Sequence, residues 1–256
     1  MKIYIDAGHG GDSIGATYKG RKEQDDCLRL ALAVKKLLLT QKGVEVKLSR
    51  ETDVNPAINV RTTEANVWGA DYFISIHRNA FSPNKAAGVE AWVYSKVSKQ
   101  GDTYKAAENI VNKVCKATGY KNRGVKLGAA SYADYGVNSL TNMPSCLLET
   151  GFIDTDSDNA IFDSKFDEMS KAIAAGLIEA CGGTWKEAAA EEQPDNGVIY
   201  RVQIGAFKDK ANAEAYAAKA KAAGFDAFVA VAGDVDGDGK ITAADARGTL
   251  RTSVGL

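Results

Sequence analysis

Short apolar runs alternate with segments of helical periodicity over most of the first 182 residues. The runs are rich in β-branched residues, as buried strands are, and they predict strands at Lys2–Asp6, Val44–Ser49, Tyr72–His77, Val89–Tyr94 and Ser145–Glu149. Leucines at helical spacing predict a helix over Asp26–Gln41, and further helices are predicted at Val60–Trp68, Asp102–Thr118 and Lys165–Cys181. Alternating strands and helices indicate an α/β layer fold. Residues 125–140 follow neither period, and we expect a loop near a functional site there.

The pattern changes after Gly182, where a polar stretch leads into a smaller unit. Residues 187–196 read Glu-Ala-Ala-Ala-Glu-Glu-Gln-Pro-Asp-Asn, which is typical of a linker. Beyond it the sequence predicts a strand at Val198–Phe207, an Ala-rich helix at Lys210–Ala223 and a strand at Phe225–Val231. The predicted organisation is a main domain at 1–182, a linker at 183–197 and a small α+β accessory module at 198–256.

Composition limits the classes of protein to which the chain can belong. Hydrophobic residues make up 45% and charged residues 25% of the 256 residues, the balance of a soluble globular protein. Lys+Arg 32 against Asp+Glu 33 leaves a formal net charge of -1, which indicates no nucleic-acid partner. No apolar run reaches the roughly 18 residues of a membrane span, and no secretion signal is visible. The scattered cysteines predict free thiols, with Cys146 buried.

The two histidines of the chain, His9 and His77, both stand at the ends of predicted strands. Ligands of an open α/β sheet gather at the carboxyl ends of its strands, so these two side chains can converge on one metal ion. A catalytic zinc takes three protein ligands and keeps one position open, which here requires a carboxylate as the third ligand. Glu23, at the entrance to the first helix, is the best-placed candidate, and its rivals are Asp6, Asp12, Asp25 and Asp26.

Glu149 ends the apolar run of the last strand predicted in the main domain. A carboxyl group at the rim of an apolar strand is expected to have a raised pKa, which suits it to take a proton from water and pass it to a leaving nitrogen. Spacing alone leaves a structural alternative open, because strand-end histidines are often hydrogen-bonding residues and surface helices are rich in glutamate.

Six motifs occur here in the order in which one known enzyme family has them. They are Ile5–Gly11 (IDAGHGG), Glu23, Leu48–Asp53 (LSRETD), Arg61–Asn66 (RTTEAN), Ser75–Ala80 (SIHRNA) and Leu148–Ile153 (LETGFI). Together they make residues 1–182 resemble the zinc-dependent N-acetylmuramoyl-L-alanine amidases often called amidase type 3. Each motif alone is a weak signal, whereas six at compatible separations are specific.

This resemblance implies a twisted mixed sheet flanked by helices, with zinc held by His9, Glu23 and His77 and with Glu149 as the catalytic acid and base. It also implies hydrolysis of the amide bond between N-acetylmuramic acid and L-alanine in peptidoglycan. Asn79 and Arg61 fall within family motifs, and we expect them to contact the substrate or to support the scaffold. Two other functions stay open: a wall-binding or assembly protein that has lost activity, and a zinc peptidase that acts on stem peptides.

The accessory module carries two further patterns. Residues 198–232 resemble the first half of a SPOR domain, a family that binds glycan strands stripped of stem peptides. The second half is not evident, so this unit could instead pair with a second copy or another protein. Residues 233–256 resemble one dockerin repeat, and their loop fits an EF-hand pattern. The expected calcium ligands are Asp234, Asp236, Asp238, Lys240, Thr242 and Asp245.

These resemblances place the expected action of the protein at the bacterial cell wall, outside the membrane, where calcium is abundant. A chain without a visible signal suits a phage endolysin released through a membrane pore. It equally suits a secreted autolysin or a sporulation enzyme whose signal was removed. We therefore expect peptidoglycan as the partner, Zn²⁺ as the catalytic cofactor, Ca²⁺ in the accessory module, and no transmembrane segment.

Overall fold

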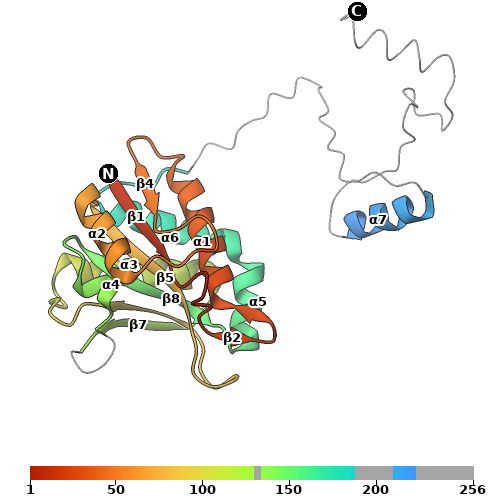
Figure 1. Cartoon of the computed structure of the whole chain (residues 1–256), viewed down its shortest axis with the longest axis horizontal. Coiled ribbons are helices and arrows are strands. Elements are labelled where there is room, and N and C mark those ends of the chain that lie inside the picture. The colour runs from red at the N-terminus through yellow and green to blue at the C-terminus, as the bar shows by residue number, and fades with distance from the viewer. Residues whose placement is uncertain (130–133, 188–209, 223–256) are drawn as a thin grey trace, which may run out of the picture. The chain divides into compact units, whose positions relative to one another are not determined.

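The computed structural model describes residues 1–129, 134–187 and 210–222, and the chain divides into two compact units, Met1–Glu191 and Glu192–Leu256. Figure 1 shows the first unit as a sheet flanked by helices. Its strands are β1 (Lys2–Ala7), β2 (Thr17–Tyr18), β3 (Arg21–Lys22), β4 (Glu45–Leu48), β5 (Tyr72–Asn79), β6 (Val89–Val93), β7 (Asn122–Leu127) and β8 (Ser145–Phe152). Its helices are α1 (Glu23–Leu38), α2 (Ile58–Trp68), α3 (Asp102–Thr118), α4 (Gly136–Ser139), α5 (Asp156–Ser164) and α6 (Phe166–Ala180).

The main sheet has six strands in the order β4-β1-β5-β8-β6-β7. Strands β4, β1, β5 and β8 are parallel, whereas β6 pairs antiparallel with β8 and parallel with β7. The mixed sheet expected from the sequence is therefore confirmed. One edge of the sheet, here called the site edge, carries the ends of β1, β5 and β8 at Ala7, Asn79 and Phe152 and the beginnings of β6 and β7 at Val89 and Asn122.

Alternating side chains bury both faces of the sheet. Along β1, Ile3 and Ile5 lie on one face and pack with α1, α3 and α6, whereas Tyr4 lies on the other face. There Tyr4 stacks on Phe73, with ring centroids 5.4 Å apart, in a cluster to which α2 and α4 contribute. This division follows from the two-residue period of a strand. Each fully buried large apolar side chain stabilises the fold by about 1.5–3 kcal/mol.

The predicted strands and helices of the first unit are present, and the differences lie at their ends and between them. The helix predicted at Asp102–Thr118 has those bounds, whereas α1 begins at Glu23 rather than at Asp26. The loop predicted at residues 125–140 is wrong in part, because β7 extends to Leu127 and α4 lies at Gly136–Ser139. Gly124 and the charged residues of β7 conceal this edge strand in the sequence.

Besides β7 and α4, the β2–β3 hairpin and helix α5 have no counterpart in the sequence-based prediction. The β2–β3 hairpin has strands of two residues each, which are too short to show a period. Its turn residues Lys19 and Gly20 take φ angles of 50° and 82°, so the turn relies on the left-handed region. Helix α5 is mostly polar, and Phe162 is its one buried apolar residue. The hairpin leads directly into Glu23, so it helps to place that residue at the site edge.

In the second unit the structure describes α7 (Lys210–Ala222), which confirms the helix predicted there. The strands predicted on either side of it and the predicted calcium loop lie outside the described residues. All four cysteines are free, and Cys146 is buried, as expected. None of the helices in the described part of the chain is both long and apolar enough to cross a membrane.

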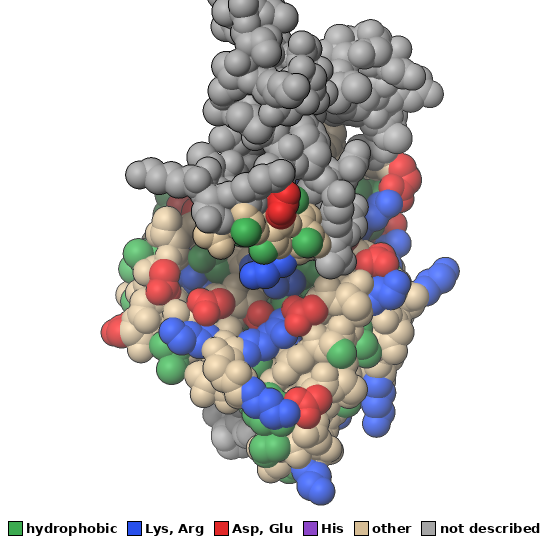
Figure 2. Space-filling model, turned by 90° about the vertical axis from the view of Figure 1, so that its right-hand side faces the viewer, with side chains coloured by type: hydrophobic (Ala, Val, Ile, Leu, Met, Phe, Trp, Pro, Cys, Tyr) green, Lys and Arg blue, Asp and Glu red, His purple; other side chains and the backbone are tan. Residues whose placement is uncertain are grey.

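Charged side chains of both signs are interspersed over the face shown in Figure 2. Surface ion pairs tie neighbouring elements together. Lys19 of the hairpin turn lies 2.9 Å from Asp156 of α5, and Arg21 of β3 lies 2.8 Å from Asp163 at the other end of that helix. Pairs of this kind balance positive and negative charge on the surface, in agreement with the small net charge of the chain.

Candidate active site and metal centre

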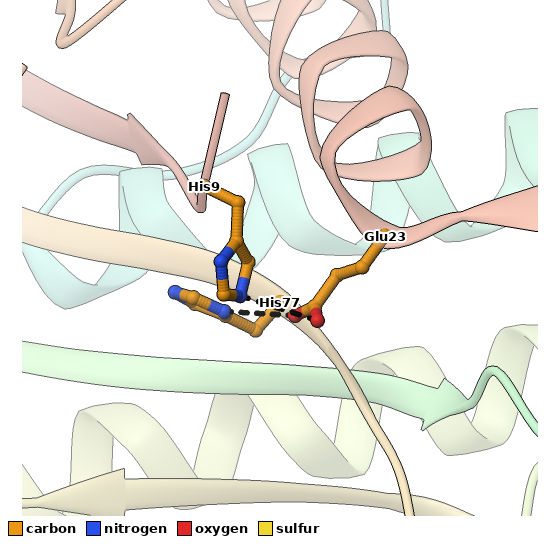
Figure 3. Close-up of side chains that lie close together, drawn as sticks. All are labelled: His9, Glu23 and His77. Carbon is orange, nitrogen blue, oxygen red and sulfur yellow. Dashed lines mark hydrogen bonds and ion pairs between the residues drawn. The ribbon is translucent and has the colours of Figure 1, made fainter. Parts of the chain in front are cut away.

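Three side chains from three elements converge at the site edge (Figure 3). His9 follows β1, Glu23 is the first residue of α1, and His77 lies in β5. Oε2 of Glu23 is 3.2 Å from Nε2 of His9, and Oε1 of Glu23 is 2.9 Å from Nδ1 of His77. One potential ligand atom from each residue lies within 4.8 Å of the other two, and no other such group occurs among residues 1–129, 134–187 and 210–222.

These three side chains fit a catalytic zinc ion. Two imidazoles and one carboxylate are a ligand set of catalytic zinc, which leaves the fourth position open. Two atoms bonded to one ion at about 2.1 Å are at most about 4.2 Å apart, so small side-chain movements suffice to bind it. The rival carboxylates are engaged or exposed: arginines bind Asp6 and Asp26, and solvent surrounds Asp12 and Asp25.

Gly8 and Gly15 provide the room in which these ligands meet. A Cβ at Gly8 would lie 2.4 Å from Cε1 of His77, and a Cβ at Gly15 would lie 2.6 Å from Oε2 of Glu23. Both distances are far inside van der Waals contact, so any larger residue would displace a ligand. His9 has a φ of 59°, a left-handed conformation that costs a residue with a side chain free energy and that concentrates at functional sites.

Hydrogen bonds orient the side chains of the candidate ligands. Nδ1 of His9 is 3.1 Å from Oγ of Ser13, which leaves Nε2 of the ring to face Glu23. Glu23 also accepts the backbone N–H of Ala16 at 2.8 Å. Burial opposes the charge of Glu23, but hydrogen bonds to His77 and His9 outweigh burial and hold its pKa well below the usual range. The carboxylate therefore stays ionised at neutral pH, as a metal ligand must.

Glu149 lies beside this group on β8. It is the strand partner of His77 in β5 and of Glu90 in β6. The side chain is almost fully buried, and within the described part of the chain its Oε2 has no hydrogen-bond partner. Burial raises the pKa of Glu149 well above its usual range, the carboxylates of Glu23 and Glu90 raise it further, and Arg78 lowers it. The raised pKa expected for a carboxyl group on this apolar strand is present.

These residues line a cleft of about 580 Å³, a volume typical of small-ligand sites. Asn79, His77 and Glu149 contribute polar groups to it. Tyr135 also lines the cleft and packs edge-on against Trp92, with ring centroids 5.9 Å apart. Further apolar lining comes from α2 and the two residues before it, from α4 and from β8, at Pro56, Ala57, Ile58, Val137 and Leu147. The cleft therefore offers an apolar surface next to its reactive groups.

Arg61 lines the cleft, yet its guanidinium is committed to the scaffold. All five of its N–H donors are bonded within the protein, at 2.6–3.2 Å, to Pro56, Asp6, Ala7, His9 and Asn55. Arg61 therefore clamps the start of α2 to the turn that carries His9. Of the two roles expected for Arg61, these bonds favour the scaffold.

Asn79 ends β5 and lines the cleft. Its Oδ1 accepts the N–H of Ala80 at 2.8 Å, and its Nδ2 donates to Glu90 at 3.0 Å, which leaves one amide N–H for other partners. Glu90 is 3% exposed and also accepts from Arg123 at 2.7 Å. Sequence reasoning missed Glu90, although a charged residue inside the apolar stretch Val89–Val93 was a usable signal.

Arg78, directly after His77, is a second residue that sequence reasoning missed. Its side chain is fully buried and donates to Asp26 in α1 and to Asn159 in α5. The guanidinium carbon lies 4.2 Å from the ring centroid of Phe162. Arg78 thus joins β5 to the helix that begins with Glu23, and so it fixes two of the candidate ligands relative to each other.

Two family models match the chain. Residues 3–179 match the model described as N-acetylmuramoyl-L-alanine amidase, and residues 196–243 match the SPOR domain. The amidase match covers the main sheet except for Lys2, and it includes all three candidate zinc ligands. The SPOR match covers more than the half domain that was evident from the sequence, and it includes α7.

Curated relatives and solved structures agree with these matches. The chain is 38% identical over 232 residues to the sporulation-specific N-acetylmuramoyl-L-alanine amidase of Bacillus subtilis (strain 168), which covers 90% of this chain and 84% of the relative. It is 34% identical to the endolysin of Bacillus phage SPP1, over 76% of this chain and 73% of the endolysin. The N-acetylmuramoyl-L-alanine amidase from Clostridium difficile 630 superposes with a TM-score of 0.64 at 29% identity, over 70% of this chain and 95% of that one. The catalytic domain of CwlV from Bacillus (Paenibacillus) polymyxa gives a TM-score of 0.62 at 30% identity, over 70% and 96%.

Proposed function

The chain belongs to the N-acetylmuramoyl-L-alanine amidase family, and from this membership we propose that it hydrolyses peptidoglycan with a zinc ion. It is an N-acetylmuramoyl-L-alanine amidase that acts on the cell wall. We assign the zinc ligands to His9, Glu23 and His77 and the proton transfer to Glu149. The observation that carries this proposal is the convergence of three ligand atoms beside a buried carboxyl group with an unpartnered oxygen in the described structure.

When bound, zinc supplies a polarised scissile carbonyl and a water whose pKa is lowered to about 7. Glu149 takes a proton from the attacking water and delivers it to the amide nitrogen as the C–N bond breaks. The products are the lactyl carboxylate of muramic acid and the free amine of L-alanine, so one water is consumed and no other reactant is needed. The raised pKa of Glu149 suits it to both directions of this transfer.

The other residues of the cleft hold the candidate ligands in place and orient the substrate. Arg61 keeps the turn of His9 in place, and Arg78 keeps α1 against β5. The remaining amide N–H of Asn79 is a donor for a polar group of the substrate. The apolar lining around Ile58 and Tyr135 gives the sugar and its lactyl group an apolar surface on which to pack.

Digestion of purified peptidoglycan by the full chain tests the activity and its metal dependence. We expect intact stem peptides with free L-alanine amino termini, identified by mass spectrometry, with activity abolished by a zinc chelator and restored by zinc. Cleavage between amino acids would instead favour the peptidase alternative. Binding of zinc and of peptidoglycan without release of peptides would favour a wall-binding protein that has lost activity.

We also propose the domain boundaries expected from the sequence: catalytic residues 1–182, linker 183–197 and accessory module 198–256. The first residues of the linker lie against the catalytic unit, where Trp185 packs on the core and Lys186 exchanges two hydrogen bonds with Gln41. The SPOR match supports peptidoglycan as the ligand of the accessory module. A pull-down of residues 183–256 on peptidoglycan stripped of stem peptides tests this binding, and sedimentation of the full chain tests self-association.

Calcium binding by the accessory module is a separate proposal, and it rests on the sequence pattern of Asp234, Asp236, Asp238, Lys240, Thr242 and Asp245. The SPOR match runs to residue 243 and so includes most of this loop. Calorimetric titration of the full chain with Ca²⁺ tests the proposal. We expect one site that is lost in Asp234→Asn/Asp236→Asn. An equal response in that variant, or no response in the wild type, would refute it.

The cell wall is the proposed place of action, because the relatives are named for it or for a process that acts on it. They include a sporulation-specific amidase and a phage endolysin. Lysis of intact cells on addition from outside, compared with digestion of spore-wall fractions, separates these two settings. We expect preference for spore material, since the sporulation-specific relative matches over more of both chains.

A further inference from the structure

A second cavity, of about 400 Å³, lies at the site edge. Its polar lining consists of Asn84, Lys85, Lys121, Arg123, Thr155 and Ser157. Three of these residues are cationic and none is acidic. We call this cavity the basic pocket.

The fold explains why these residues meet. Lys85 lies in the loop between β5 and β6, Lys121 and Arg123 stand at the start of β7, and Thr155 follows β8. Because β6 and β7 begin where β5 and β8 end, all of these segments reach the same edge of the sheet. The basic pocket therefore lies on the β7 side of the site edge, whereas the candidate zinc ligands lie on the β1 and β5 side.

Hydrogen bonds connect the basic pocket to the catalytic cleft. Arg123, in the basic pocket, donates to one oxygen of Glu90 at 2.7 Å, and Asn79, in the cleft, donates to the other at 3.0 Å. Glu90 is buried, so this connection is rigid. One molecule of substrate can therefore contact both cavities across a fixed span.

The charge of the basic pocket is largely uncompensated. Among the described residues, no carboxylate lies within 4.0 Å of the ammonium group of Lys85 or Lys121. The acidic residues at the start of the neighbouring α5 already have partners. Asp156 binds Lys19 at 2.9 Å and accepts from Asn84 of the basic pocket at 3.3 Å, and Asp158 accepts two backbone N–H groups at 2.8 Å. A concave site with unpaired ammonium groups and without acids attracts anions.

The distance between the two cavities determines which part of the substrate would carry that anion. Neighbouring strands are about 4.8 Å apart, so the three steps from β5 to β7 amount to about 14 Å. An extended peptide advances about 3.4 Å per residue, which puts the α-carbon of its third residue about 10 Å from the bond that is cut. A long side chain on the third residue covers the remaining distance.

We propose that the basic pocket binds a side-chain carboxylate on the third residue of the stem peptide, and so favours diaminopimelate over lysine at that position. The proposal rests on the proposed amidase function, because it places the bond that is cut at the candidate zinc site. Lysine and diaminopimelate both carry an ammonium group at the end of the side chain, but only diaminopimelate adds a carboxylate there, which offsets the repulsion from Lys85 and Lys121. The basic pocket thus acts on substrate choice, not on the chemical step.

Three synthetic muramyl tripeptides test this proposal, with diaminopimelate, its side-chain amide or lysine as the third residue. The full, zinc-loaded chain is compared with Lys85→Gln/Lys121→Gln, in which both exposed ammonium groups are removed. We expect the ratio of kcat/KM for diaminopimelate to that for lysine to fall about fivefold or more, mostly through KM. The effect should weaken with added salt, because the charges are exposed. Lys99→Gln/Lys116→Gln removes the same charge from exposed positions elsewhere and should leave the ratio unchanged.

Equal losses for all three substrates, or an unchanged ratio in Lys85→Gln/Lys121→Gln, would overturn the proposal. Failure of the wild type to cleave any of the three would count against the amidase function itself. The pocket is then still tested by calorimetric binding of the free tripeptide L-alanyl-γ-D-glutamyl-diaminopimelate. Weaker binding by the double variant than by the wild type supports the proposal, and equal binding refutes it.

Discussion

Two sets of charged side chains occupy the catalytic unit, one buried around the cleft and the other exposed on the surface of the unit. The buried pair Arg61–Asp6 is 5% and 1% exposed and sits in a dense network of hydrogen bonds. In the exposed pair Lys165–Glu168 both side chains are 46% exposed, and they make a single contact at the start of α6. Water screens the second pair but not the first, so only the first can fix the positions of backbone segments.

Glu149 does not follow the pattern of the buried set. Arg61 and Arg78 each meet an opposite charge, whereas Glu149 is buried next to two other carboxylates, Glu23 and Glu90. The free-energy cost of burying the Glu149 carboxylate is therefore offset only in part, by the charge of Arg78. Buried charges that are paired hold this site together, and the buried charge that is opposed by its neighbours is the one suited to react.

The largest expected effect comes from removing a candidate ligand. His77→Ala should lose stoichiometric zinc, measured by elemental analysis, and peptidoglycan hydrolysis should fall by about 10³-fold or more, because the ion supplies several kcal/mol of transition-state stabilisation. Ser13→Ala is the matched control, since Ser13 only orients His9. It should weaken zinc binding by about 10–100-fold. Full zinc occupancy in His77→Ala would contradict the ligand assignment.

The second largest effect is expected from a substitution of Glu149 alone. Glu149→Gln should keep its zinc and lose about 10²–10⁴-fold in kcat, because the group that moves the proton is gone. Near-wild-type hydrolysis in a zinc-loaded variant would show that another group does this work.

The same substitution should make the metal-free protein more stable than the metal-free wild type at neutral pH. The pKa of Glu149 is raised in the folded state above its ordinary value of 4.5, so its ionisation favours unfolding as the pH rises from 4.5 toward the folded pKa. Melting temperatures of metal-free Glu149→Gln and wild type should therefore be similar near pH 4. Near pH 7–8 the variant should be higher by about 2–4 °C, or about 1 kcal/mol. A gap that is constant with pH would argue against a raised pKa.

Breaking a matched buried pair should cost stability. Arg61→Met leaves the carboxylate of Asp6 buried and unpaired, and we expect a loss of about 3–5 kcal/mol in denaturant unfolding. Arg61→Met/Asp6→Asn should recover part of this loss, because the uncompensated charge is removed. A double variant as unstable as the sum of the two single variants would contradict this explanation.

The smallest effect belongs to the exposed set. Lys165→Gln removes the partner of Glu168 and should change the free energy of unfolding by no more than about 0.5 kcal/mol, measured in the same denaturant experiment. A loss close to that of Arg61→Met would remove the distinction between the two sets.

The sequence predicted the parts of the site that depend on local pattern. His9, His77 and Glu149 each lie at or just after the end of an apolar run, and the parallel strands bring those ends together. The start of α1 at Glu23 was harder to predict, because the hairpin before it has no periodicity. Helix α5 was not predicted, because Phe162 is its one buried apolar residue and a single residue shows no helical period.

The supporting contacts could not be predicted, because they join residues that are distant in sequence. Arg78 and its partner Asp26 are 52 residues apart, and Arg123 and Glu90 are 33 residues apart. The sequence around either residue does not indicate which residue is its partner. A buried charge on an apolar strand signals only that some partner exists.

Strand direction reverses between β8 and β6, so the ends of β1, β5 and β8 and the beginnings of β6 and β7 all lie at the site edge. The groups proposed to cut lie in or directly after β1, β5 and β8 and at the start of α1, whereas most of those proposed to choose the substrate lie in the loops that enter β6 and β7. Residues 81–88 and 119–121 can thus vary during evolution without altering the candidate metal ligands. Exchanging these two short loops between relatives is accordingly a route to lytic enzymes directed at walls of different chemistry.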